Sequence, residues 1–227
     1  MTGTLHAVRF PGESDAYRAA RDRLLEREIE LRGALEAVAA LRRELPLGGR
    51  VKEDYVFDEA NRAAAGSIAL SKLFEGGKRS LIVYSYMYGP AAEQPCPMCT
   101  SFLDGVNAYA PHITQRVNLV VVARSPAERL RAWAARRGWD RLRLLSSASN
   151  TYNADYAAET PDGQQLPACN VFTSTDAGIF HFWSAEMLYA PTPGHARHVD
   201  LLWPIWSFFD LTPEGRGKDW LPKLSYP

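Results

Sequence analysis

The sequence predicts an α/β fold in which a mixed sheet is flanked by helices and preceded by a long helical extension. Three observations predict it. Residues 14–45 have the length and the apolar period of one long helix. From residue 80 to residue 146, apolar strand-like runs alternate with helical runs, an order that is typical of parallel strands joined by helices. Residues 166–184 then carry two strand-like runs around a short connection, which indicates an antiparallel hairpin at the edge of the sheet.

The N-terminal helix is predicted from its caps and from its apolar stripe. Ser14 or Asp15 can cap its start, and Pro46 ends it. Apolar side chains recur every seven residues along it, at Tyr17, Leu24, Leu31, Val38 and Leu45. Such a stripe needs a cover, so we expect it to pack on its own domain and keep a homodimer through this helix as the alternative. Arg27 interrupts the neighbouring row, which disfavours a coiled coil.

The change of period after this helix sets the domain boundary. Residues 1–50 are predicted as an N-terminal helical extension and residues 51–227 as one domain. Its strands are predicted from β-branched and aromatic runs, and its helices from apolar side chains that recur on one face. In chain order we predict a strand at 55–57, a strand at 80–88, a helix at 97–109 stopped by Pro111, a strand at 117–123, a helix at 126–137 opened by Ser125, a strand at 142–146, and the hairpin strands 166–173 and 178–184. The aromatic segment from residue 198 onward is expected to dock on this domain.

Length, charge and composition exclude several classes of protein. The 227 residues, 46% of them apolar, suffice for a large core. The 26 basic and 26 acidic residues balance, so nothing at this level indicates a nucleic acid or an anionic membrane as a partner. No apolar run approaches the ~18 residues that cross a bilayer, and residues 1–10 lack the features of a secretory signal. We therefore expect a cytoplasmic protein.

The chemistry of the chain is concentrated in one dithiol. Three cysteines are too few for a secreted disulfide scaffold, and two of them form the motif Cys96-Pro97-Met98-Cys99 after a buried strand. Because proline is favoured at the first helical position, Cys96 falls at the N-cap, where free amides and the helix dipole stabilise a thiolate. We predict Cys96 as the nucleophile and Cys99, one turn further in, as the thiol that resolves the mixed disulfide.

Three further residues are predicted to bind a thiol or disulfide substrate. Pro97 and Met98 lie between the two cysteines, and Pro167 precedes a predicted strand. A cis peptide bond at Pro167 would place backbone beside the dithiol, where a bound substrate can pair with it. Cys169 lies two residues further on and is either a third redox sulfur or, as we expect, a buried packing residue.

A metal site is the main alternative interpretation of the dithiol. Structural zinc needs four ligands, and the nearest second pair, His195 and His198, lies in a segment rich in proline and glycine. Soft thiolates hold copper(I), and in a copper-binding alternative His181 on the predicted hairpin approaches the pair. We nevertheless expect His112 and His181 to be structural, and the sequence predicts no resident metal and no cofactor.

A cluster of arginines lies in the second half of the chain. Residues 124–143 contain seven arginines and only two acids, Glu128 and Asp140. We expect a solvated helix face, and the alternative is a surface that attracts an acidic partner or a small anionic thiol.

Several motifs resemble one known family. The sequence Met87-Tyr88-Gly89-Pro90 leads into the dithiol, Pro111 is followed by His112, Asn153 stands near Tyr156, and Asp210-Leu211-Thr212-Pro213-Glu214-Gly215-Arg216 lies near the end. Together they resemble the bacterial thioredoxin-like family known as domain of unknown function 899, within the thioredoxin and peroxiredoxin superfamily. The resemblance covers nearly the whole length. It implies a thioredoxin-like, peroxiredoxin-type fold and names no substrate.

The chain departs from the patterns of these relatives in two places. Family members often have a tryptophan shortly after the second cysteine, where Phe102 and Leu103 stand. Peroxiredoxins hold a peroxide with a Pro-x-x-x-Thr-x-x-Cys signature, but Gly89 and Glu93 occupy those places relative to Cys96. Without the threonine, a peroxide oxygen loses a positioned hydrogen-bond partner, which disfavours efficient peroxidase chemistry.

These observations predict a thiol–disulfide oxidoreductase that acts on a protein or a small-molecule thiol or disulfide. Two alternatives stay open. One is a thioredoxin-like module that binds copper, zinc or a partner protein without turnover. The other is a thiol-dependent peroxidase, in which Cys96 would form a sulfenate.

Overall fold

The chain divides into two units, Met1–Pro46 and Leu47–Pro227. The computed structural model describes residues 5–60, 66–190, 202–217 and 219–226. Within these ranges, no helix combines the length and the apolar character that crossing a membrane requires.

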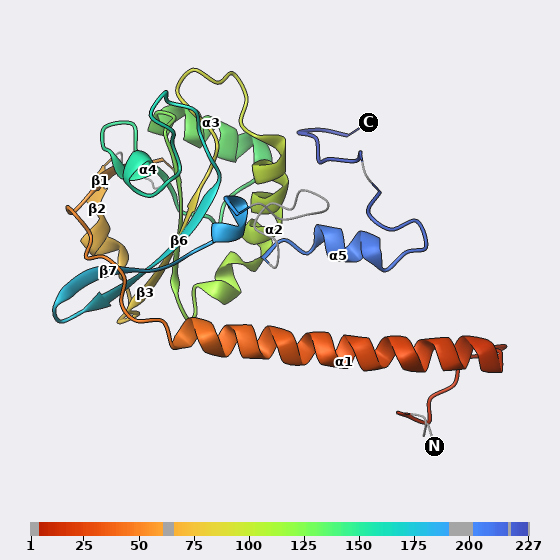
Figure 1. The fold of residues 1–227 in the computed structure, drawn as a ribbon. Helices are drawn as coiled ribbons and strands as arrows, with labels where there is room; N and C mark the ends of the chain where they lie inside the picture. Colours follow the sequence, from red (N-terminus) through yellow and green to blue (C-terminus); the bar gives the residue numbers. More distant parts are fainter. Residues whose placement is uncertain (1–4, 61–65, 191–201, 218, 227) are drawn as a thin grey trace. The chain divides into compact units, whose positions relative to one another are not determined.

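The first unit contains helix α1, Asp15–Arg43 (Figure 1). The Ser14 hydroxyl accepts a hydrogen bond from the Tyr17 amide at 3.2 Å, so the predicted N-cap is confirmed. Side chains of the apolar stripe are exposed, with values of 48% for Leu24 and 61% for Leu31. A homodimer through this helix stays a prediction.

The second unit is organised around a seven-stranded mixed sheet, in the order β2-β1-β5-β4-β3-β6-β7. Strands β3, β4 and β5 are parallel, as the alternation of elements predicts, and β6 and β7 form an antiparallel hairpin beside β3. Strand β1 pairs antiparallel with β5, and β2, which has no predicted counterpart, completes that edge. The bounds are β1 Val56–Glu59, β2 Ser67–Ala69, β3 Ser80–Ser85, β4 Asn118–Ala123, β5 Leu144–Ser146, β6 Ala168–Thr175 and β7 Gly178–Ser184.

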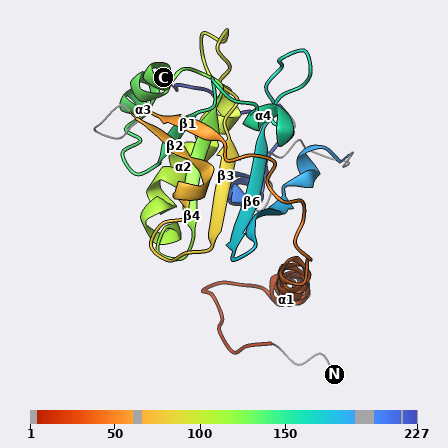
Figure 2. The same cartoon turned by 90° about the vertical axis from the view of Figure 1, so that its left-hand side faces the viewer.

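Helices cover both faces of this sheet (Figures 1 and 2). On one face lie α2 (Pro97–Ile113), α3 (Ala127–Arg137) and α5 (Ile205–Asp210), which share a core cluster with Tyr84 and Val121. On the other face lie α4 (Tyr152–Asp155) and the 3₁₀ turn Leu70–Leu73, which pack with Val83 and Val120. A second 3₁₀ turn, Glu186–Leu188, follows β7. Successive side chains of β3 and β4 belong alternately to the two clusters, as expected for strands buried on both sides.

The C-terminal segment docks on the domain as predicted. Trp203 and Trp206 are buried, with 4% and 1% of their surface exposed. The Trp203 ring meets that of Phe102 on α2 at a centroid distance of 6.4 Å. The segment therefore adds apolar cover to the helix that carries the dithiol.

The predicted end of helix α2 is wrong. The helix continues through Pro111 to Ile113 instead of stopping at residue 109. Proline removes one backbone donor from the last turn, but the Thr114 amide still donates to the Ala110 carbonyl at 2.9 Å. A single lost hydrogen bond so close to the C-terminus does not break the helix.

The arginine cluster keeps an exposed face, as expected, with Arg131, Arg136 and Arg141 exposed, but most of its members also bind other segments of the fold. Five of the seven arginines bind backbone carbonyls or carboxylates of other segments. Arg143, for example, donates from Nε to Glu59 at 2.9 Å. The five are Arg124, Arg129, Arg131, Arg137 and Arg143.

Candidate functional site

The dithiol lies where the chain passes from strand β3 to helix α2, and the intervening loop is fixed by backbone contacts. The Cys96 amide donates to the Met87 carbonyl at 3.0 Å. From α3, Arg129 donates to the Pro90 carbonyl at 2.6 Å and also to the Ala92 carbonyl. These contacts place Cys96 at a defined position before the helix begins.

Cys96 caps helix α2, as the position of Pro97 predicts. Its backbone is not helical, with φ −57° and ψ 123°, and Pro97 is the first helical residue. The Cys96 sulfur accepts a hydrogen bond from the Cys99 amide at 3.4 Å. The Cys96 carbonyl accepts from the Thr100 amide at 3.0 Å, which starts the helical hydrogen-bond pattern. The sulfur thus occupies the place that a capping oxygen takes in other helices.

The surroundings of Cys96 favour its thiolate. A hydrogen bond from the Cys99 side chain is the largest cause, and the Cys99 and Met98 amides add to it, so that the pKa of Cys96 falls to about 6 despite partial burial. The side chain is half-buried rather than sealed. An acidified thiol with access to solvent has the properties of a nucleophile.

This acidity predicts the pH dependence of alkylation. Because only the thiolate reacts, the rate at which iodoacetamide modifies Cys96 should rise with pH around a midpoint of about 6. An ordinary thiol has its midpoint near ~8.5. Mass spectrometry of peptides quenched at each pH assigns the rate to Cys96. In Cys99→Ala the midpoint should rise, because the substitution removes the side-chain hydrogen bond that contributes most to the lowered pKa. A wild-type midpoint near that of an ordinary thiol would contradict the geometry.

Cys99 has the opposite character. Its side chain is fully buried, and burial, followed by the proximity of Cys96, raises its pKa well above the ordinary value. Both cysteines are free thiols in this structure. The pair therefore combines an accessible, acidic sulfur with a protected one, as the predicted roles of attack and resolution require.

The three predicted substrate-binding residues lie in two segments, the first turn of α2 and the residue before β6. Pro97 is exposed and Met98 is partly buried beside the dithiol. Pro167 directly precedes β6, whose first residue pairs with Ser85 at the end of β3. Its peptide bond is trans, so the cis arrangement considered for it is wrong. A role in substrate binding stays a prediction for all three.

Cys169 is a packing residue by its surroundings. It lies on β6 with 2% of its surface exposed and pairs with Tyr84 of β3 in the sheet. Burial raises its pKa to about 12, so its thiolate is scarcely populated at neutral pH. This environment agrees with the expected structural role and disfavours a third redox sulfur.

Comparison with known proteins places the chain in a family. The profile of a family described as "bacterial protein of unknown function (DUF899)" matches residues 8–226. The chain belongs to this family. Among curated proteins, the comparison finds no match to this DUF899 chain.

Solved structures similar to this DUF899 protein include peroxiredoxins. The reduced 2-Cys peroxiredoxin of Plasmodium vivax has 15% identity and a TM-score of 0.50, over 70% of this chain and 93% of its own. Peroxidoxin BcpB of Mycobacterium tuberculosis has 20% identity and a TM-score of 0.43, over 57% and 79% of the two chains. Peroxiredoxin Q of Xanthomonas campestris has 12% identity and a TM-score of 0.47, over 63% and 90%. The similarity to the Plasmodium vivax protein shows the fold of this chain, which is thioredoxin-like and of the peroxiredoxin type. A long N-terminal helix precedes it in sequence.

His181 is separated from the dithiol by the sheet. Its ring stacks on that of Tyr156 at a centroid distance of 5.8 Å, and its Nε2 shares a hydrogen bond of 2.8 Å with Asn170 Oδ1. Tyr156 and Phe172, which His181 contacts, belong to the core cluster on the face opposite Cys99. The suggested approach of His181 to the dithiol is therefore wrong.

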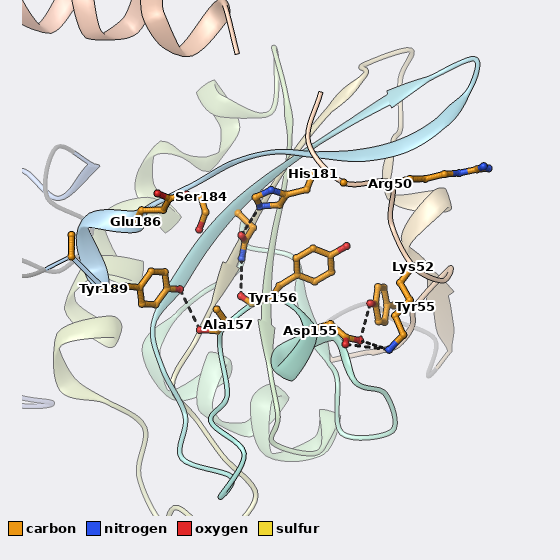
Figure 3. A pocket seen from close by; sticks show the side chains of 13 residues that line it. Arg50, Lys52, Tyr55, Asp155, Tyr156, Ala157, His181, Ser184, Glu186 and Tyr189 are labelled. Carbon is orange, nitrogen blue, oxygen red and sulfur yellow. Dashed lines mark hydrogen bonds and ion pairs between the residues drawn. The ribbon is translucent and has the colours of Figure 1, made fainter. Parts of the chain in front are cut away.

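Tyr156, Asn170 and His181 also line an open pocket of ≈ 810 Å³ on that opposite face (Figure 3). Its wall includes Tyr55 and Asp155, joined by a hydrogen bond of 2.9 Å. Among the residues that the structure describes, no three His, Cys, Asp or Glu side chains gather into a metal-binding group. His112 is exposed near the end of α2, and His195 and His198, the pair considered for the disfavoured zinc site, lie outside the described residues.

Sequence reasoning missed one polar contact of the dithiol. The Tyr84 hydroxyl is hydrogen-bonded to the Cys99 side chain. The sequence does place Tyr84 in a buried strand, and alternate side chains of such a strand point toward the helix that follows it. The contact itself depends on how β3 lies against α2, which spacing along the chain does not specify.

Proposed function

We propose that this DUF899 protein is a thiol–disulfide oxidoreductase whose nucleophile is Cys96 and whose resolving thiol is Cys99. One observation carries the proposal: a half-buried sulfur caps a helix and is hydrogen-bonded to the side chain of a second, fully buried cysteine. A thioredoxin-like fold with this arrangement can support disulfide exchange.

The proposed reaction has two steps. The Cys96 thiolate attacks one sulfur of a substrate disulfide, the disulfide bond breaks, and the departing sulfur takes up a proton. Cys99 then loses its proton and attacks Cys96, which releases the second substrate sulfur as a thiol. Two electrons pass from the protein to the substrate, and the Cys96–Cys99 disulfide that remains is reduced again by a thiol of the cell.

The substrate class follows from the exposed part of the site. Pro97 is exposed and Met98 half-exposed, so a protein or a small-molecule disulfide can reach Cys96 across them. As parts of the same proposal, these two residues and Pro167 bind the substrate, and the reaction takes place in the cytoplasm, where the dithiol is kept reduced.

The experiment that tests the proposal is capture of the intermediate. In Cys99→Ser, reaction with 5,5′-dithiobis(2-nitrobenzoate) should release one equivalent of thionitrobenzoate and leave one equivalent attached to Cys96. The wild-type protein should release two equivalents and keep none, and Cys169→Ser should match the wild type. Retention of the adduct by the wild-type protein would contradict the proposal.

The same samples separate the proposal from its alternatives. A metal-binding module would hold stoichiometric copper or zinc after purification without a tag, and the metal would block release of thionitrobenzoate. A peroxidase would form a sulfenate on Cys96 at limiting peroxide faster than it reduces disulfides. Gly89 and Glu93 stand where peroxiredoxins place the proline and threonine that hold the peroxide, which favours disulfide exchange.

A further inference from the structure

Tyr84 is the residue of the central sheet that meets the buried sulfur of the dithiol. Its side chain is 2% exposed and that of Cys99 is 0% exposed, and both belong to the same core cluster. The Tyr84 hydroxyl and the Cys99 side chain are joined by a hydrogen bond. The Tyr84 ring packs on Phe102 at a centroid distance of 4.8 Å, and β3 is paired on both sides, so the hydroxyl has a fixed position.

The resolving step needs a partner of this kind. Cys99 must become a thiolate in a buried site, where the loss of water raises its pKa well above the ordinary value. The hydrogen bond with Tyr84 acts against that burial and lowers the pKa of Cys99. Burial also raises the pKa of Tyr84 itself, so its hydroxyl keeps its proton and remains a donor over the whole working range of pH.

We propose that Tyr84 is the positioning residue of the resolving step, and that its hydroxyl donates a hydrogen bond to the Cys99 thiolate that attacks Cys96. The inference rests on the proposed function and adds to it. In this step a bond forms between the two cysteine sulfurs, the bond between Cys96 and the substrate breaks, and the electron pair leaves with the substrate sulfur. That sulfur gains a proton as Cys99 loses one, and Tyr84 keeps its own.

The test is Tyr84→Phe, which retains the ring and removes the hydroxyl. Wild type and variant, in excess over 5,5′-dithiobis(2-nitrobenzoate), are mixed in a stopped-flow instrument and the release of thionitrobenzoate is followed between pH 5 and 10. The first phase reports attack by Cys96 and should change less than about twofold. The second phase reports resolution and should be about tenfold slower at pH 7, with its pH midpoint about one unit higher.

Tyr86→Phe is the matched control. This residue lies on the same chain segment, and its hydroxyl is bonded to Thr100 Oγ1 at 2.7 Å rather than to Cys99. Both phases should stay within about twofold of the wild type. Three results would overturn the role of Tyr84. They are an equal slowing in the control, an unchanged second phase in Tyr84→Phe, and a slower second phase whose pH midpoint does not move.

A second measurement keeps the test valid if Tyr84→Phe does not fold. Replacement of Tyr84 by 3-fluorotyrosine retains the hydroxyl and makes it a stronger donor, so the midpoint of the second phase should fall. An unchanged or raised midpoint would overturn the inference. The two proposals fail in different ways: a wild-type protein that releases no second equivalent contradicts the oxidoreductase, whereas normal wild-type release with no effect at Tyr84 contradicts only this inference.

Discussion

Cys96→Ser should lower the rate of disulfide reduction by about 1,000-fold or more, because the substitution removes the only sulfur of the pair that is both acidified and accessible. Cys99 cannot take its place at neutral pH, since its side chain is fully buried and its pKa is raised. The measurement is the steady-state reduction of a small disulfide at pH 7 with dithiothreitol as the electron donor, corrected for the reaction without protein.

The third cysteine provides the control for this experiment. Cys169→Ser changes a buried sulfur on β6, and the reduction rate should stay within about twofold of the wild type. A Cys96→Ser protein that keeps a tenth of the wild-type rate would show that the chemistry resides elsewhere. Far-UV circular dichroism of each variant confirms that the comparison is made between folded proteins.

The asymmetry of the dithiol gives the two steps of the proposed reaction different pH dependences. Attack by Cys96 gains speed as pH rises through about 6 and then levels off, because the thiolate is fully formed. Resolution by Cys99 continues to accelerate at higher pH, because its raised pKa leaves most of the thiol protonated at pH 7. Mixed disulfides should therefore persist longest in the mildly acidic range.

The position of the proposed nucleophile was predictable from local sequence. Pro97 marks the first helical residue, so Cys96 had to cap the helix, and the strand-like run before it placed the motif at the end of the sheet. The order of parallel strands was predictable for a similar reason, since alternating strand and helix periods leave few topologies.

Other features depend on contacts between distant segments, which local patterns do not contain. The approach of Tyr84 to Cys99 depends on how α2 lies on the sheet, and the local sequence does not specify the isomer of the bond before Pro167, which is trans. Arginine spacing suggests a solvated surface, yet Arg129 extends to a loop carbonyl that lies 39 residues away in sequence. Such long side chains find partners only once the fold is complete.

Trp206→Ala should lower the free energy of unfolding by about 3–5 kcal/mol, because it removes a large buried ring and leaves a cavity. The side chain is 1% exposed, and its ring meets those of Trp203 and Trp220 at centroid distances of 5.3 and 5.9 Å. Trp203 in turn contacts Phe102 on α2, so the cavity would loosen the cover over the helix that carries the dithiol. Urea denaturation followed by circular dichroism measures the change.

Phe208→Ala is the control, because this residue lies on the same short helix but is 64% exposed. Removing its side chain should lower the free energy of unfolding by less than about 0.5 kcal/mol. Equal losses of unfolding free energy in the two variants would show that α5 does not pack through Trp206. In folded Trp206→Ala protein the alkylation midpoint of Cys96 should stay near pH 6, since the hydrogen bonds that set it come from Cys99 and Met98. The segment then stabilises the domain while the chemistry remains a local property of the helix start.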